Sequence, residues 1–342
     1  MDNHNSDAME LTMNLVRIDS TDPGAYEGEI GEFIFQYLKG LDVPVIKKEV
    51  LPGRFNVMAR LEGEEQAPAL VYICHMDTVT TGEGWTVSPF GAEVIKGRIY
   101  GRGACDMKSG LACALSAFTS MALKARDGQK PKRTLVFIGT VDEEDFMRGA
   151  EAAIADGWVT KDCWVLDTEP TNGRIEVAHK GRTWFEITVK GITAHASTPW
   201  KGADAIAAMA ELISFIRRRI ASCPVHPDLG ASTVTFGQIE GGYRPYVVPD
   251  SCRVWIDMRL VPPTDTTSAV TIVEDAIADA IQEIPGITAS YQITGNRPYV
   301  EKDEQSPLLK ALGEACQKVT GEPAYALEEK DPELALAHAK WV

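Results

Sequence analysis

Tyr-Ile-Cys-His-Met-Asp-Thr-Val, residues 72–79, places His75 and Asp77 two positions apart just where an apolar run ends. The run covers residues 70–74 and predicts a buried strand. A neutral imidazole is a good ligand for a divalent transition metal. A nearby carboxylate can accept the other ring N–H and fix the tautomer. By itself the His-x-Asp pattern is weak, because short motifs recur by chance.

Three further acidic clusters follow, each near or directly after an apolar run. They are Asp106 within the glycine-rich stretch 101–110, Asp142-Glu143-Glu144 after the run 134–139, and Asp167 with Glu169 after the run 163–166. In open α/β sheets, ligand sites lie outside the carboxyl ends of the strands. Carboxylates gathered there repel one another unless a cation compensates their charge. One such cluster is more often a solvated turn, but four in this arrangement favour a site for one or two divalent ions.

Strands and helices alternate up to about residue 180, which predicts an α/β domain with a mostly parallel central sheet. Beyond this point the order becomes strand-helix-strand-strand-helix-strand, which is typical of a ferredoxin-like sandwich. The expected elements are 184–190, 204–220, 232–240, 251–260, 266–284 and 287–294. Helical sequence resumes at 306–319. We therefore expect residues 181–294 to be an insertion in a discontinuous domain formed by residues 1–180 and 295–342.

The composition is that of an ordinary globular enzyme. Of the 342 residues, 44% are hydrophobic and 24% are charged, and no apolar run approaches the roughly 18–20 residues that span a bilayer. The net charge of −15, from 34 basic and 49 acidic residues, opposes binding to nucleic acid or to an anionic membrane. Seven cysteines without framework spacing and a polar N-terminus without a secretory signal predict free thiols in a reducing cytoplasm.

With these motifs in place, the sequence resembles the co-catalytic zinc peptidases and deacylases known as the M20 peptidases. That family includes acetylornithine deacetylase, succinyl-diaminopimelate desuccinylase, carboxypeptidase G2 and aminoacylase-1. The resemblance is carried, in the family's order, by residues 75–77, 101–110, 142–144, 169–171 and 191–197. It covers roughly three quarters of the chain. It implies a zinc-peptidase-like catalytic domain, an inserted lid that forms a homodimer, and a small amide or peptide as substrate.

The resemblance also implies a role for individual residues at a pair of divalent metal ions, with zinc expected and cobalt or manganese as alternatives. Asp106 would bridge the two ions, His75 and Glu169 would bind one of them, and Glu144 would bind the other. A bridge of this kind holds two ions about 3.5–4 Å apart, the separation used in two-metal hydrolysis. Asp167 stays open as a rival of Glu169.

Four more residues would serve the reaction without binding metal. Glu143 would act as the general base that moves a proton from water to the leaving nitrogen, and Asp77 would orient His75. His195 would donate to the developing oxyanion in the partner subunit's site, unless it is a loop histidine that caps the following helix. Arg259 would bind a substrate carboxylate through its guanidinium fork, and a structural salt bridge is the open alternative.

Some positions depart from the family pattern. Phe146 stands where relatives usually carry glycine, and Tyr246 stands where they usually carry asparagine. Near the C-terminus, His338 resembles the histidine that closes the site in relatives, but the elements that usually precede it are missing. We expect His338 to complete the ligands of the second ion, and a segment between about residues 327 and 336 to be absent from this sequence. A terminal helix that merely carries His338 is the alternative.

The sequence therefore predicts a dinuclear metal amidohydrolase that cleaves an amide next to a free carboxylate, in N-acyl-amino acids or short peptides. A strict dipeptidase or carboxypeptidase is one alternative. A non-catalytic homologue that only binds metal or ligand is another, and the intact Glu143 argues against it. The stretch 101–110 lacks the glycine spacing of a nucleotide-binding loop, which sets aside an oxidoreductase.

Overall fold

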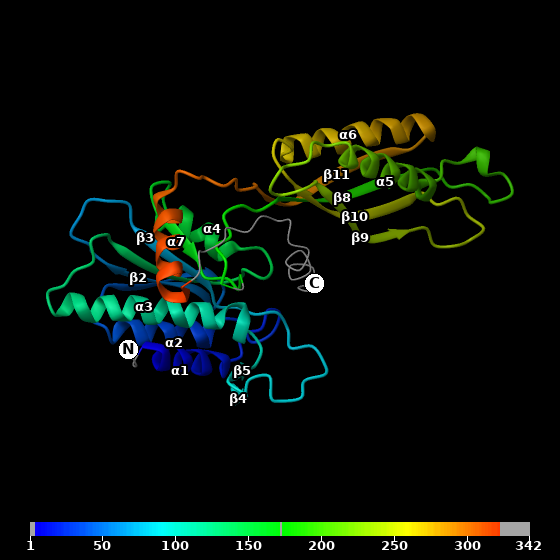
Figure 1. Ribbon diagram of the computed structural model, residues 1–342. Coiled ribbons are helices and arrows are strands. Elements are labelled where there is room, and N and C mark those ends of the chain that lie inside the picture. The colour runs from blue at the N-terminus through cyan, green and yellow to red at the C-terminus, as the bar shows by residue number, and fades with distance from the viewer. Residues whose placement is uncertain (1–3, 172, 322–342) are drawn as a thin grey trace. The chain divides into compact units, whose positions relative to one another are not determined.

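A computed structural model describes residues 4–171 and 173–321 (Figure 1). The contacts divide the chain near residue 172 into two compact units. The predicted boundary at residue 180 and the predicted return of residues 295–342 to the first domain stay predictions. Within the described ranges, no helix combines the length and the apolar character that crossing a bilayer requires.

The first unit is built on a five-stranded sheet whose spatial order is β1-β2-β6-β3-β7. The strands are β1 (Val45–Leu51), β2 (Arg54–Leu61), β3 (Leu70–His75), β6 (Leu135–Thr140) and β7 (Trp164–Asp167). β3 pairs in parallel with β6 and β7, whereas β2 pairs antiparallel with β1 and β6. The sheet is therefore mixed, with β2 running against the other four strands. Residues 52–53 join β1 to β2, and so short a link allows a hairpin but not a parallel crossover.

Helices cover both faces of this sheet (Figure 1). On one face lie α1 (His4–Val16), α2 (Gly28–Lys39) and α3 (Ser109–Arg126), which share a buried apolar cluster with β2, β3 and β6. In that cluster the rings of Phe118 and Phe137 lie 6.5 Å apart between centroids. On the other face, α4 (Arg148–Ala155) buries Ala153 against Met58, Val71 and Ile138. A small hairpin of β4 (Glu93–Ile95) and β5 (Arg98–Tyr100) lies between β3 and α3 in the sequence.

The second unit confirms the predicted strand-helix-strand-strand-helix-strand order. Its elements are β8 (Gly181–Lys190), α5 (Ala205–Ala221), β9 (Thr233–Gly241), β10 (Ser251–Leu260), α6 (Thr266–Glu283) and β11 (Thr288–Arg297), and α7 (Pro307–Thr320) follows. The four strands form one antiparallel sheet of order β11-β8-β10-β9.

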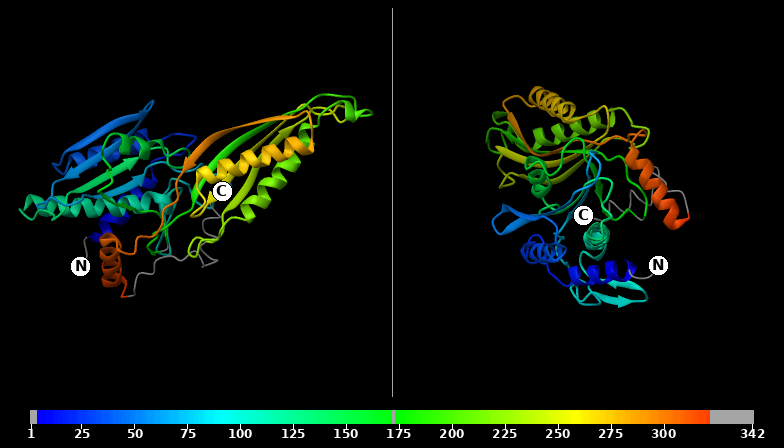
Figure 2. Two further views of the ribbon diagram at one scale, coloured as in Figure 1. Left: turned by 90° about the horizontal axis from the view of Figure 1, so that it is seen from above. Right: turned by 90° about the vertical axis from the view of Figure 1, so that its left-hand side faces the viewer.

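Helices α5 and α6 lie side by side on one face of this sheet (Figure 2). Alternate residues of β8 explain why, because Phe185, Ile187 and Val189 are fully buried in the same apolar cluster as residues of both helices. The result is the ferredoxin-like sandwich expected from the sequence.

Candidate metal centre

Three neighbouring parallel strands bring the predicted acidic clusters to one edge of the first sheet. β3 ends at His75, β6 ends two residues before Asp142, and β7 ends at Asp167. Because β6, β3 and β7 are adjacent and parallel, their carboxyl ends meet. Asp106 joins this edge from the turn at 104–108 that leads into α3. Motifs that are far apart in the sequence therefore form a single cluster in the folded protein.

His75 lies at the centre of the cluster and is 2% exposed. Its Nε2 atom is 3.0 Å from Oδ1 of Asp106 and 3.4 Å from Oε1 of Glu169. Its Nδ1 atom is 2.9 Å from the backbone carbonyl oxygen of Asp77, which can only accept a hydrogen bond. A proton on Nδ1 satisfies that contact and leaves the Nε2 lone pair facing the carboxylates, as a metal ligand requires.

The carboxylate of Asp77 has a different contact from the one expected. It lies 3.7 Å from Nδ1 of His75, which is farther than the carbonyl of the same residue. Instead, its oxygens accept the backbone N–H groups of Glu143 at 3.2 Å and of Glu144 at 2.9 Å. Asp77 thus orients the histidine through its main chain, and its fully buried side chain holds the segment that carries the two glutamates.

Two sets of potential ligand atoms overlap at His75. In one set, the atoms of His75, Asp106 and Glu144 lie within 4.8 Å of one another, and in the other set those of His75, Glu143 and Glu169 do so. Among the described residues, Asp167 belongs to neither set. The geometry therefore favours Glu169 over Asp167 as a ligand. One imidazole nitrogen with several carboxylate oxygens is a donor set that suits zinc and its first-row neighbours.

Burial and neighbouring charges shift the pKa values of several groups in this cluster. Burial, reinforced by the facing acids, raises the pKa of Glu143 and that of Glu144 to about 7. Burial and the charge of Glu169 raise the pKa of Asp167 to about 7 as well. Burial alone would lower the pKa of His75, but its contacts with Asp106 and Glu169 raise it well above its ordinary value. Divalent cations would replace these retained protons as the compensating charge.

Phe146, which stands where relatives usually carry glycine, lies in the loop after Glu144. The backbone N–H of Met147 donates to the carbonyl of Asp142 over 2.5 Å and closes the loop. Phe146 is 42% exposed and its ring lies under the guanidinium of Arg148, 5.0 Å from the centroid. The phenyl ring is accommodated on the outside of the loop.

His195 and Arg259 lie in the second unit. Nδ1 of His195 accepts from the N–H of Ser197 at 3.2 Å and lies 2.8 Å from its hydroxyl oxygen, which leaves Nε2 as the protonated nitrogen and a donor. Both carboxylate oxygens of Asp257 accept from Arg259, at 2.9–3.2 Å. Arg259 is thus in the salt bridge that the sequence left open, with about half of its side chain exposed. His338 and the segment 327–336 lie outside the described residues.

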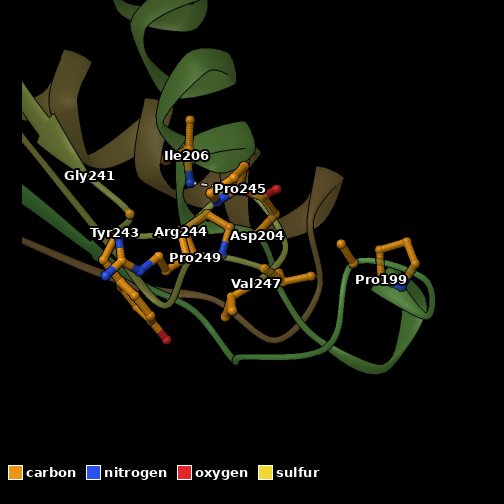
Figure 3. Close-up of a pocket in the computed structure, with 12 residues that line it drawn as sticks. Pro199, Asp204, Ile206, Gly241, Tyr243, Arg244, Pro245, Val247 and Pro249 are labelled. Atoms are coloured by element: carbon orange, nitrogen blue, oxygen red, sulfur yellow. Dashed lines mark hydrogen bonds between the residues drawn. The ribbon is translucent and has the colours of Figure 1, made fainter.

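A cavity of about 580 Å³ lies beside the His195 loop within the second unit (Figure 3). Its lining includes Tyr243, Arg244 and Val247 after β9, and Asp204 and Ile206 at the start of α5. His195 forms a backbone bridge with Val247. Tyr246, the second departure from the family pattern, is 57% exposed, and its carbonyl accepts the N–H of Ala196 at 3.0 Å.

Comparison with known proteins agrees with this arrangement. A sequence model of peptidase family M20/M25/M40 matches residues 71–338. The acetylornithine deacetylase of Vibrio cholerae serotype O1 is 28% identical over 319 residues, covering 91% of this chain and 82% of the relative. A "Probable succinyl-diaminopimelate desuccinylase" of Staphylococcus aureus is 27% identical over 310 residues, covering 82% and 74% of the two chains.

Solved structures share the fold. The aminopeptidase PepT of Bacillus cereus aligns with a TM-score of 0.76 and 24% identity, covering 95% of this chain and 84% of its own. A protein of Bacillus subtilis described as a dinuclear metal binding peptidase aligns with a TM-score of 0.69 and 18% identity, covering 95% and 82%.

These matches, together with the cluster around His75, place the protein in the class of hydrolases that act on amide bonds. More particularly, the chain belongs to peptidase family M20/M25/M40, a metal-dependent family.

Proposed function

We propose that this protein is a dinuclear metal amidohydrolase that cleaves an amide next to a free carboxylate, and that it acts on N-acyl-amino acids. The observation that carries the proposal is the cluster of potential ligand atoms around His75, in which its Nε2 atom lies 3.0 Å from Asp106 and 3.4 Å from Glu169. In this assignment His75, Asp106 and Glu169 would hold one ion, and Asp106 and Glu144 would hold the other. The ions, which we expect to be zinc, supply when bound an acidified water and a polarised carbonyl group.

The remaining steps belong to the side chains of this protein. Glu143 takes a proton from the attacking water and returns it to the leaving nitrogen, which is the role of a general base that becomes a general acid. His195 donates from Nε2 to the developing oxyanion, and the acceptor role of its Nδ1 supports this assignment. The two roles require Glu143 and His195 to reach the same substrate.

His338 is proposed as the remaining ligand of the second ion. In the assignment above, that ion has only Asp106 and Glu144 as protein ligands. Four ligands are usual for zinc in proteins, and catalytic sites commonly use three protein ligands with one open position. We also propose that a segment between about residues 327 and 336, which relatives carry before this histidine, is absent from the sequence.

The choice between deacylation and peptide hydrolysis rests on the sequence relatives. The named relatives that align over most of the chain are a deacetylase and a desuccinylase, which favours removal of an acyl group. Peptidases enter the comparison as solved structures below 25% identity. A strict dipeptidase or carboxypeptidase is therefore the second candidate.

A substrate panel tests this function. The purified, metal-loaded protein should hydrolyse N-acetyl- and N-succinyl-amino acids faster than dipeptides, and free acids faster than the matching carboxamides, by about tenfold or more in kcat/KM. Arg259→Met should raise KM for the free acids and leave the carboxamides unchanged, because only the former offer a partner to the guanidinium. Equal rates on free acids and carboxamides would contradict the carboxylate requirement. Faster cleavage of dipeptides would select the second candidate.

A subunit-mixing experiment tests a homodimer, proposed to form through residues 181–294, in which His195 serves the partner's site. Glu143→Gln and His195→Ala are each expected to be nearly inactive. Mixed at equal amounts, they should recover roughly a quarter of wild-type activity, because half of the dimers would be mixed and each would hold one complete site. Native mass spectrometry of differently tagged subunits confirms exchange. Exchange without recovered activity would exclude the cross-subunit role.

A further inference from the structure

A buried ion pair lies next to the segment that carries Glu143 and Glu144. Glu27, the residue before α2, is 1% exposed, and Arg54, the first residue of β2, is 8% exposed. The guanidinium of Arg54 donates to both carboxylate oxygens of Glu27, at 2.6 Å each. It also donates to Asp22 at 2.6 Å and lies 3.3 Å from the carboxylate of Asp142. The two-pronged contact is the strongest form of such a pair.

Glu27 also contacts the main chain next to Glu143 and Glu144. Oε1 of Glu27 accepts the N–H of Asp142 at 2.8 Å. The carboxylate of Asp77 accepts the next two N–H groups, those of Glu143 and Glu144. Three consecutive amides are thus received by two buried carboxylates that come from different parts of the chain. Successive N–H groups that point to one side form a concave site for negative charge.

These contacts matter because Asp142 has an unfavourable backbone conformation. Its φ is +68°, in the left-handed region that a residue other than glycine occupies only at a cost. The side chain of Asp142 is held by Arg148, whose Nε and Nη2 each donate over 2.5 Å. The directions of the Glu143 and Glu144 side chains follow from this turn. A general base must lie within hydrogen-bond reach of its proton, and a displacement of 1 Å can lower a rate by about 100-fold.

Arg54 also explains a third acidic group near the site. Ligand atoms of Asp22, Glu27 and Asp77 lie within 4.8 Å of one another, a spacing that could suggest another cation site. The guanidinium of Arg54 contacts Asp22 and Glu27 directly. A fixed cation of the protein therefore compensates the charge at this place, which distinguishes this group from the proposed metal ligands around His75.

We propose that Glu27 and Arg54 are positioning residues for the Glu143–Glu144 segment, acting through the backbone N–H of Asp142. Arg54 fixes the carboxylate of Glu27, and that carboxylate fixes the first of the three amides. The expected effect on the rate rests on the proposed function. The expected effect on the amides of residues 142–144 does not.

Two substitutions at Glu27 separate positioning from stability. Glu27→Gln keeps an oxygen that can accept the N–H of Asp142 but removes the charge, whereas Glu27→Met removes both. Each loses the ion pair with Arg54, so each should melt at a lower temperature than the wild type. At 25 °C, with both variants folded, kcat should fall about 10- to 100-fold in Glu27→Met, with KM within about twofold, and should stay within about threefold of wild type in Glu27→Gln. A purely structural ion pair predicts equal kcat for both.

Hydrogen exchange of the metal-free protein gives a readout that needs no substrate. Peptides that span residues 142–144 should exchange faster in Glu27→Met, by about tenfold or more, and near the wild-type rate in Glu27→Gln. Leu38→Ala is the matched control, because it removes a fully buried side chain from α2, the helix that Glu27 precedes, without touching the turn. It should lower the melting temperature and leave both kcat and the exchange of residues 142–144 unchanged.

The outcomes are decisive in both directions. Unchanged exchange at residues 142–144 in Glu27→Met would refute the positioning role, whatever the activity. If the protein hydrolysed no amide, faster exchange would still support that role while the proposed function failed. Should Glu27→Met not fold, Arg54→Lys carries the test, because lysine keeps the charge but cannot make the two-pronged contact. It should also accelerate exchange at these residues, and wild-type exchange there would overturn the part assigned to Arg54.

Discussion

Glu143→Gln is expected to lower kcat by about 10²- to 10⁴-fold while the protein keeps close to its normal metal content. The substitution preserves the size of the side chain and removes only its capacity to take and return a proton. Glu143 is next to Glu144 in the chain but is not itself a proposed ligand, so the substitution leaves the proposed ligands of both ions unchanged. The test is steady-state kinetics on the best substrate of the panel, with metal content measured by elemental analysis of the same samples.

Two controls sharpen this experiment. Glu144→Gln should lose metal as well as activity, because that residue is the proposed ligand of the second ion. Glu83→Gln, at an exposed position in the loop before β4, should change neither. If Glu143→Gln kept more than about a tenth of the wild-type kcat, its role as the base would be wrong.

Asp106→Asn is expected to cost the protein both metal ions. Oδ1 of Asp106 faces Nε2 of His75 at 3.0 Å, and the proposed bridge serves both ions at once. An amide keeps the shape of the carboxylate but lacks its charge, and a divalent cation is held less strongly by a neutral amide oxygen than by a charged carboxylate oxygen. Elemental analysis after gel filtration should fall from two ions per chain toward none, and activity should disappear with it.

His75→Ala is the companion to this variant, and it too should lose metal and activity. Circular dichroism of both variants separates loss of metal from loss of fold. Two metal equivalents retained by Asp106→Asn would exclude the bridge. One equivalent retained would assign Asp106 to a single ion.

The edge that gathers the acidic residues could be predicted because it follows from a rule of parallel sheets. His75, Asp142 and Asp167 each come at or just after the end of a strand, and neighbouring parallel strands end at the same edge. Each cluster alone had a simpler interpretation as a solvated turn. The clusters became informative because all of them follow strand ends. The two sets of potential ligand atoms at His75 lie at the sheet edge that this placement predicts.

The partners of the turn could not be predicted in the same way. Glu27 contacts the amide of Asp142 across 115 positions of sequence, and no periodicity or short motif marks such a pair. The contact of the Asp77 side chain was equally hidden. Its closeness to His75 in the sequence suggested that its carboxylate would accept from the imidazole, but its backbone carbonyl does so. The antiparallel direction of β2 within the mostly parallel sheet could not be read from the pattern of the strands, because it depends on the two-residue connection between β1 and β2.

The proposed ligands around His75 come from four segments that meet only when the first unit is folded: the ends of β3 and β6, the turn before α3 and the stretch after β7. The unfolded chain therefore offers no site of comparable affinity. Under that condition, the free energy of ion binding adds directly to the free energy of folding, by mass action. If the proposed ions bind, their removal is expected to lower the stability of the folded protein as well as its activity, because the metal-free chain lies closer to unfolding.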